Sequence, residues 1–115
     1  MAVTIYHNPK CSKSRETLQI LLVDGHEPTV IDYLQNPPSA EKLEELLGLL
    51  GLEPRDLMRR KEAEYVEYGL NAPDLSRESL IKAMVDHPIL IERPIVVHGD
   101  RAVIGRPPES VRKVL

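Results

Sequence analysis

Short runs of β-branched residues alternate along the chain with stretches in which leucine recurs at helical spacing. The apolar residues over 3–6 and over 29–34 predict two strands. Between them, residues 12–23 place leucines on one side of a helical repeat, which predicts a helix ending near Gly25. A strand, a helix and a strand in this order and at this length favour a parallel βαβ unit.

The middle of the chain is predicted to be helical. The Asn-Pro-Pro segment over 36–38 ends the second strand, and Ser39 is suited to cap a helix with leucines on one face. Two short helical segments are expected over 54–60 and 61–68, and a longer helix over 76–85 that stops before a proline.

The last part of the chain predicts a β-hairpin followed by a helix. Residues 95–97 and 102–104 are β-branched runs, and the four residues between them contain Gly99-Asp100, which suits a tight turn. Residues 108–115 are expected to form the closing helix. The element order therefore predicts an α/β fold with a helical insertion between the N-terminal βαβ unit and the C-terminal hairpin.

Composition limits the classes of protein that fit. With 115 residues, of which 42% are hydrophobic and 29% charged, one domain over 1–115 is expected. A net charge of −3 and the absence of Phe and Trp argue against nucleic-acid binding.

No secretory signal and no apolar run of bilayer length is present, so no membrane partner and a cytoplasmic location are expected. A monomer is expected, because no long apolar surface stripe is left over.

The single cysteine, Cys11, follows the first predicted strand and precedes the first helix. A thiol there faces unpaired backbone N–H groups and the positive end of the helix dipole, and both favour the thiolate. Free cysteine is also common as a small buried hydrophobe, but the polar neighbours over 10–16 indicate an accessible thiol. Nearby His7 either orients this loop or is a structural histidine. No metal site is expected, because these two are the only soft ligands close in sequence.

Two arginines are predicted to face each other at the open end of the hairpin. Extending the hairpin register outward places Arg93 opposite Arg106, and like charges directly opposite destabilise a sheet. Either Glu92 and Glu109 neutralise these arginines, or the pair forms a clamp for an oxyanion, whose geometry matches guanidinium forks. A basic run that starts at Arg59 is, taken alone, typical of a solvated helix face.

Several motifs follow one another in a fixed order along essentially the whole chain. They are His7-Asn8-Pro9-x-Cys11-x-x-Ser14-Arg15, Tyr33-Leu34-x-x-Pro37-Pro38, Arg59 ahead of Tyr65 and Gly69-Leu70, His87-Pro88-Ile89-Leu90-Ile91-x-Arg93-Pro94-Ile95-Val96-Val97, and Arg106-Pro107. Together they resemble the glutaredoxin-coupled arsenate reductase family. Cys11-Ser12-Lys13-Ser14 is most similar to the shorter branch of that family and replaces the Cys-Gly-Thr of its best-known members.

The resemblance implies a thioredoxin-like fold with a mixed four-stranded sheet and a cis peptide bond at Arg93-Pro94. It also implies that Cys11 is the nucleophile and that three arginines surround the oxyanion. The matching arginines are Arg59, Arg93 and Arg106. The supporting residues are His7, Asn8, Ser14 and Pro94. Ser14 is expected to donate a hydrogen bond to the sulfur and so to lower its pKa.

By the same resemblance, the expected activity is reduction of arsenate to arsenite, with glutathione as co-substrate, glutaredoxin as partner protein and no bound cofactor. The lone Cys11 requires an external sulfur for any thiol redox cycle. Two alternatives stay open. One is a glutathione-linked thiol-disulfide oxidoreductase whose arginines bind glutathione carboxylates. The other is a non-catalytic thioredoxin-fold regulator that contacts RNA polymerase, although such regulators commonly carry Cys-x-x-Cys where this chain has Ser14.

Overall fold

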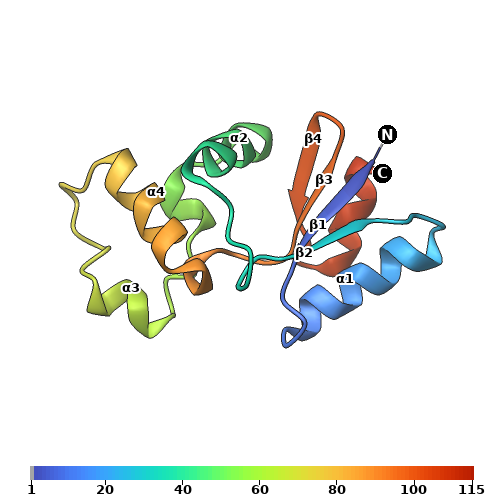
Figure 1. Ribbon diagram of the computed structural model, residues 1–115, viewed down its shortest axis with the longest axis horizontal. Helices are drawn as coiled ribbons and strands as arrows, with labels where there is room; N and C mark the ends of the chain where they lie inside the picture. The colour runs from blue at the N-terminus through green and yellow to red at the C-terminus, as the bar shows by residue number, and fades with distance from the viewer. Residues whose placement is uncertain (1) are drawn as a thin grey trace. The chain divides into compact units, whose positions relative to one another are not determined.

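The computed structural model describes residues 2–115, which form two compact units. One unit comprises residues up to Asn36 together with Arg93–Leu115, and the other comprises Pro37–Glu92. The first unit contains a four-stranded sheet in the order β2-β1-β3-β4 (Figure 1). Its strands are β1 (Val3–His7), β2 (Thr29–Asp32), β3 (Ile95–His98) and β4 (Arg101–Ile104).

The sheet of the first unit is mixed, as expected. β1 pairs in parallel with β2, and α1 (Ser12–Val23) connects them with the predicted bounds. β3 pairs antiparallel with both β1 and β4. The four-residue link expected between β3 and β4 implies pairing of Val97 with Ala102 and of Ile95 with Ile104, and both pairs are present. The link is two residues shorter than expected, because His98 pairs with Arg101 and only Gly99-Asp100 turns, with Gly99 at φ 64°.

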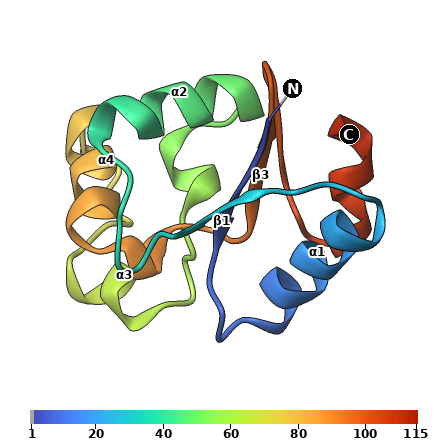
Figure 2. The same cartoon turned by 45° about the vertical axis from the view of Figure 1, so that its right-hand side comes forward.

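Two helices cover one face of this sheet. α1 and the C-terminal 3₁₀ helix η3 (Pro108–Val114) lie side by side, which both ribbon views show (Figures 1 and 2). The closing helix is therefore confirmed, in its tighter form. The apolar side chains buried beneath these helices form the core of the unit: Val3, Ile5, Leu21, Val96, Val111 and Val114.

The second unit is helical, as the sequence predicts. It contains α2 (Ala40–Leu50), η1 (Pro54–Leu57), α3 (Ala63–Glu67), α4 (Arg77–Asp86) and η2 (Pro88–Leu90). Ser39 caps α2, because its hydroxyl accepts from the backbone N–H of Lys42 at 3.1 Å. The two segments expected over 54–60 and 61–68 are shorter than predicted, and a bridge residue and a turn over 58–62 separate them.

The residue that follows η1, Met58, pairs with Ile91 in an isolated antiparallel bridge. Both side chains are buried, with exposed fractions of 4% and 2%. The bridge brings the segment before α3 beside the segment that ends the unit. This pairing joins residues far apart in sequence, so local periodicity gave no sign of it.

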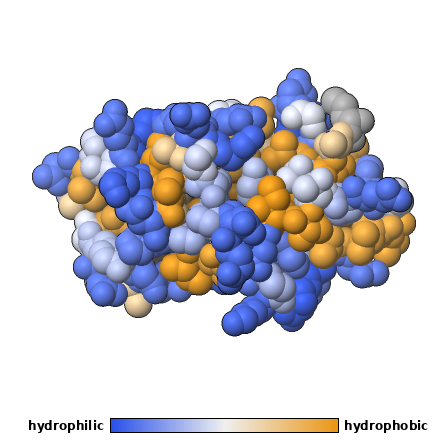
Figure 3. All heavy atoms as spheres, in the orientation of Figure 1, coloured by the Kyte–Doolittle hydropathy of each residue, from blue (hydrophilic) through white to orange (hydrophobic). Residues whose placement is uncertain are grey.

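Apolar side chains remain on the surface of the first unit where β2 and the end of α1 lie (Figure 3). Leu22, Val23 and Val30 are exposed by 51%, 70% and 47%. Within residues 2–115, no helix has both the length and the hydropathy needed to cross a bilayer.

Candidate active site

Cys11 is the N-cap residue of α1, with extended backbone angles of φ −95° and ψ 124°. A turn from Asn8 places it there, because the Cys11 N–H donates to the Asn8 carbonyl at 3.0 Å. The Asn8 side chain secures the same turn by accepting from the Lys10 N–H at 3.0 Å. The thiol is partly exposed, so Cys11 is not a buried hydrophobe.

The surroundings of the sulfur lower the pKa of Cys11 below its usual value. Partial burial acts in the opposite direction and raises the pKa, but hydrogen bonds outweigh it. Among the groups that lower the pKa, the backbone N–H of Ser14 is the largest single one. The Arg93 guanidinium adds a hydrogen bond and its charge, and the Lys13 N–H contributes as well. The predicted stabilisation of a thiolate at the helix start therefore has identifiable donors.

Ser14 acts on the sulfur through its backbone, whereas its hydroxyl stabilises the loop by contacts with residues that precede Cys11. The buried hydroxyl lies 2.6 Å from Nδ1 of His7 and accepts from the Asn8 N–H at 3.0 Å. The hydrogen bond expected from Ser14 to the sulfur is therefore made by the backbone N–H of Ser14 and not by its hydroxyl. Burial lowers the pKa of His7, although Asp32 opposes this, and a neutral imidazole accepting from the Ser14 hydroxyl satisfies both groups.

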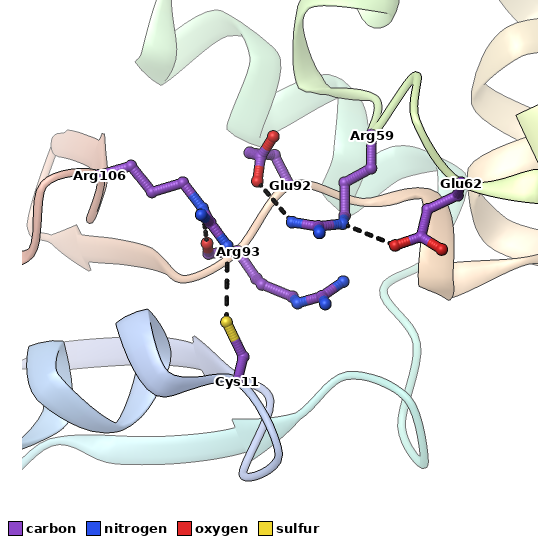
Figure 4. Close-up of polar contacts among 6 residues, drawn as sticks. All are labelled: Cys11, Arg59, Glu62, Glu92, Arg93 and Arg106. Carbon is purple, nitrogen blue, oxygen red and sulfur yellow. Dashed lines mark hydrogen bonds and ion pairs between the residues drawn. The ribbon is translucent and has the colours of Figure 1, made fainter.

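Two arginines from the ends of the hairpin strands lie beside the sulfur (Figure 4). Arg106 Nη2 donates to Cys11 Sγ at 3.5 Å, and its Nε donates to the Arg93 carbonyl at 2.7 Å. Burial lowers the pKa of Arg93, yet its hydrogen bond to Cys11 and the nearby Tyr33 leave that pKa above its usual value. The Cys11 thiol and two guanidinium groups therefore converge within the first unit.

Arg106 lies beside the sulfur, but its position relative to Arg93 differs from the predicted one. The strand pairing ends at Ile104, and the Gly105 N–H donates to the Pro94 carbonyl at 2.9 Å. Arg106 then leaves the ladder, so it is not the cross-strand partner of Arg93 but a neighbour of its carbonyl. The cis bond expected at Arg93-Pro94 is present, and Arg106-Pro107 is cis as well.

The third predicted arginine, Arg59, belongs to the second unit, where two carboxylates bind it (Figure 4). Its Nε donates to Glu62 Oε1 at 3.0 Å and its Nη1 to Glu92 Oε1 at 2.9 Å. The side chain is only 23% exposed, so Arg59 is not part of a solvated helix face. Sequence reasoning did not find Glu62, although its i,i+3 spacing from Arg59 is a usable signal.

The sheet order, the thiol at the start of α1 and the two guanidinium groups beside it define a thioredoxin-like protein with an activated cysteine. The model of the ArsC family matches residues 6–114. The chain belongs to the ArsC family.

Known relatives extend over the full length of the chain. It is 54% identical over 114 residues to the uncharacterized protein YfgD of Escherichia coli, with 98% of this chain and 96% of that protein aligned. It is 48% identical over 116 residues to the arsenate reductase of Haemophilus influenzae, with 100% of both aligned. The solved structure of the arsenate reductase from Vibrio cholerae superimposes with a TM-score of 0.98 at 54% identity, covering 100% of this chain and 98% of that one.

Proposed function

We propose that this protein is an arsenate reductase that uses Cys11 as its nucleophile. The observation that carries the proposal is the convergence of Cys11, Arg93 and Arg106 within one unit, together with the lowered pKa of the thiol. A thiolate beside two guanidinium groups is suited to attack the central atom of a tetrahedral oxyanion. The names of the relatives identify arsenate as that oxyanion.

In the proposed first step, the Cys11 sulfur donates an electron pair to arsenic(V), and one arsenate oxygen leaves as water after taking up protons. The product is a covalent Cys11–arsenic adduct. The guanidinium groups of Arg93 and Arg106, and of Arg59 as the third oxyanion ligand, offset negative charge on the remaining oxygens. His7, Asn8 and Ser14 maintain the loop that presents the sulfur, and Pro94 keeps Arg93 in place.

In the proposed second step, glutathione thiolate attacks the Cys11 sulfur. The sulfur–arsenic bond breaks, its electron pair stays on arsenic, and arsenite leaves as arsenic(III). Cys11 remains as a mixed disulfide with glutathione, and glutaredoxin restores the thiol by exchange. The sequence holds one cysteine, so no second thiol of the same chain is available for this role. A glutathione-containing cytoplasm would supply these reductants.

The test is an assay of arsenate-dependent NADPH consumption with glutathione, glutathione reductase and glutaredoxin supplied. Wild type is expected to consume NADPH only when arsenate, glutathione and glutaredoxin are all present. Cys11→Ser is expected to abolish the reaction, whereas the exposed Ser12→Ala serves as the matched control and retains it.

Two outcomes would contradict the proposal. Full activity of Cys11→Ser would remove the nucleophile from the mechanism. Reduction of a glutathione mixed disulfide without any response to arsenate would favour the general thiol-disulfide oxidoreductase.

A further inference from the structure

A groove runs between α2 and α4, two helices of the second unit that lie side by side (Figures 1 and 2). Its volume is about 570 Å³, and every residue that lines it belongs to this unit. The groove is open to solvent rather than enclosed. A small molecule needs a site that surrounds most of its surface, so an open groove of this kind is better suited to a segment of another protein.

Part of the groove lining is apolar. Ile81 of α4 is buried, with an exposed fraction of 3%, and Val85, about one turn further along the same helix, is partly exposed. Ala40, at the start of α2, contributes an exposed methyl group from the opposite wall. Apolar side chains of a partner would remove the exposed part of this strip from water, which favours binding.

The polar part of the lining is mainly acidic. It consists of Glu41 and Glu44 from α2, and of Glu78, Lys82 and Asp86 from α4. Two of the carboxylates are paired: Asp86 accepts from Lys82 at 2.6 Å, and Glu44 accepts from Arg77 at 2.9 Å. The carboxylates of Glu41 and Glu78 have no ion-pair or hydrogen-bond partner within residues 2–115. Each of the two helices that flank the groove therefore carries one unpaired negative charge.

The charge of the unit determines the sign of the partner that fits. Residues 37–92 include more acidic than basic residues, so the electrostatic field of the unit attracts a basic segment and repels an acidic one. A lysine or arginine on the partner would find an unpaired carboxylate beside the apolar strip on either wall.

The walls of the groove also determine the conformation of the partner. Both walls are helices, whose backbone groups are bonded within the helix except at its ends. They offer no row of main-chain partners to an extended segment, whose own backbone groups would remain unpaired in the groove. A helix satisfies its backbone hydrogen bonds internally, so a helical segment meets this requirement.

We propose that the groove between α2 and α4 is a docking site for a basic amphipathic helix of a partner protein. The apolar side chains of that helix cover Ala40, Ile81 and Val85, and its lysine or arginine side chains pair with Glu41 and Glu78. The inference uses no property of Cys11, so it is independent of the proposed function.

The probe is a synthetic, fluorescently labelled peptide in which leucine and lysine occupy opposite faces of one helix. Its binding to the full chain is measured by fluorescence anisotropy at low ionic strength. Wild type is expected to bind this leucine–lysine peptide, and added salt is expected to weaken binding. Two reference peptides, one with glutamate in place of lysine and one with serine in place of leucine, are each expected to bind about tenfold more weakly or less.

The charged contacts are tested with the double variant Glu41→Gln/Glu78→Gln, which is expected to raise the Kd of the leucine–lysine peptide about tenfold. Glu67→Gln/Asp74→Asn is the matched control, because both of its carboxylates are exposed in the same unit and lie outside the groove. The control removes the same net charge and is expected to leave the Kd within about twofold of wild type.

The apolar contacts are tested with Val85→Gln, which is expected to raise the Kd about tenfold because it removes apolar surface from the groove. Val66→Gln is the matched control, since Val66 is 72% exposed in the same unit and does not line the groove. Circular dichroism verifies the fold of each variant. Should Val85→Gln not fold, Ala40→Gln is measured in its place, and an unchanged Kd there overturns the proposal.

The proposal is overturned if the leucine–lysine peptide does not bind wild type, if the glutamate peptide binds equally well, or if the control variants weaken binding as much as the groove variants. Sedimentation velocity of the chain alone tests for a different occupant. A dimer that Val85→Gln dissociates would place a second copy of the chain in the groove and would also overturn the proposal. The assay of arsenate-dependent NADPH consumption is separate from these measurements, so failure of either proposal leaves the other intact.

Discussion

At the scale of single residues, the Cys11 loop shows how one residue can act separately through its backbone and through its side chain. The backbone of Ser14 lowers the pKa of the thiol, while the Ser14 hydroxyl is turned away toward His7 and Asn8. A sequence motif shows that a serine is required at this position. It does not show whether the backbone N–H or the hydroxyl is needed, because either role would keep the same residue in the motif.

The lowered pKa of Cys11 gives a prediction for the pH dependence of alkylation. The thiolate reacts, so a lower pKa moves the rise in rate to lower pH than for an unperturbed thiol. Arg93→Ala removes a hydrogen bond and a positive charge, so the pKa of Cys11 is expected to rise and the inflection to move to higher pH. Iodoacetamide rates measured across pH test this, with a several-fold slower reaction expected at neutral pH. An unchanged inflection in Arg93→Ala, or an equal shift in the exposed control Arg101→Ala, contradicts it.

A second prediction concerns the buried hydroxyl of Ser14, which is fully inaccessible to solvent. Ser14→Ala leaves His7 Nδ1 and the Asn8 N–H without their partner, so the free energy of unfolding is expected to fall by about 1–3 kcal/mol. Urea denaturation measures the change. The exposed Ser12→Ala is the control and is expected to stay within about 0.5 kcal/mol of wild type. Equal stability of the two variants would contradict a structural role for the hydroxyl.

At the scale of elements, α1, β4 and the segment at Pro94 meet at one glycine. A Cβ built on Gly105 would lie 2.6 Å from Thr17 Oγ1 and 2.8 Å from Pro94 Cγ. Neither atom moves easily, because Thr17 is fully buried and its hydroxyl donates to the Lys13 carbonyl at 2.8 Å. The absence of a side chain at Gly105 therefore lets these elements approach and lets the chain turn toward Arg106.

Gly105→Ala is expected to destabilise the protein by about 1–3 kcal/mol, because the added methyl group overpacks this junction. It is also expected to weaken protection of Cys11 by arsenate, since Arg106 is the next residue. Gly48→Ala is the matched control within α2, where nothing lies within 4 Å of the added atom. That variant is expected to gain about 0.5–1 kcal/mol from higher helix propensity. Chemical denaturation measures both, and a loss of stability in both variants alike would contradict the argument.

At the scale of the whole molecule, the features predicted correctly from sequence are those with a strong local signal. α1 has its predicted bounds, and the hairpin register follows from Gly99-Asp100. The paired segments at Met58 and Ile91 could not be found in this way, since 33 residues separate them and neither shows strand periodicity. The length and type of η1 were not predicted for another reason. Four residues are too few to distinguish a 3₁₀ turn from an α-helix.

The residues of the candidate site also fall into those that the sequence predicts and those that it does not. Cys11 and the arginines were predicted from motifs, and Arg93 and Arg106 are confirmed as neighbours of the sulfur. The two carboxylates that bind Arg59 were not predicted. The contact with Glu92 is a tertiary one, whereas Glu62 has the local i,i+3 spacing. The units also differ in charge: residues 37–92 hold twelve acidic and seven basic residues, and the remainder holds six acidic and eight basic. The thiol therefore lies in the unit with excess positive charge.

The solitary, partly exposed thiol has a consequence under oxidative stress. Peroxide converts a thiolate to sulfenic acid, which a neighbouring cysteine would normally capture as a disulfide. The sequence has no second cysteine, so a disulfide at Cys11 can form only with a thiol from another molecule. When small thiols run short, further peroxide carries the sulfur on to the sulfinic state, which thiol exchange does not reverse. If Cys11 is the nucleophile, as proposed, activity is therefore expected to be lost irreversibly when small thiols are depleted.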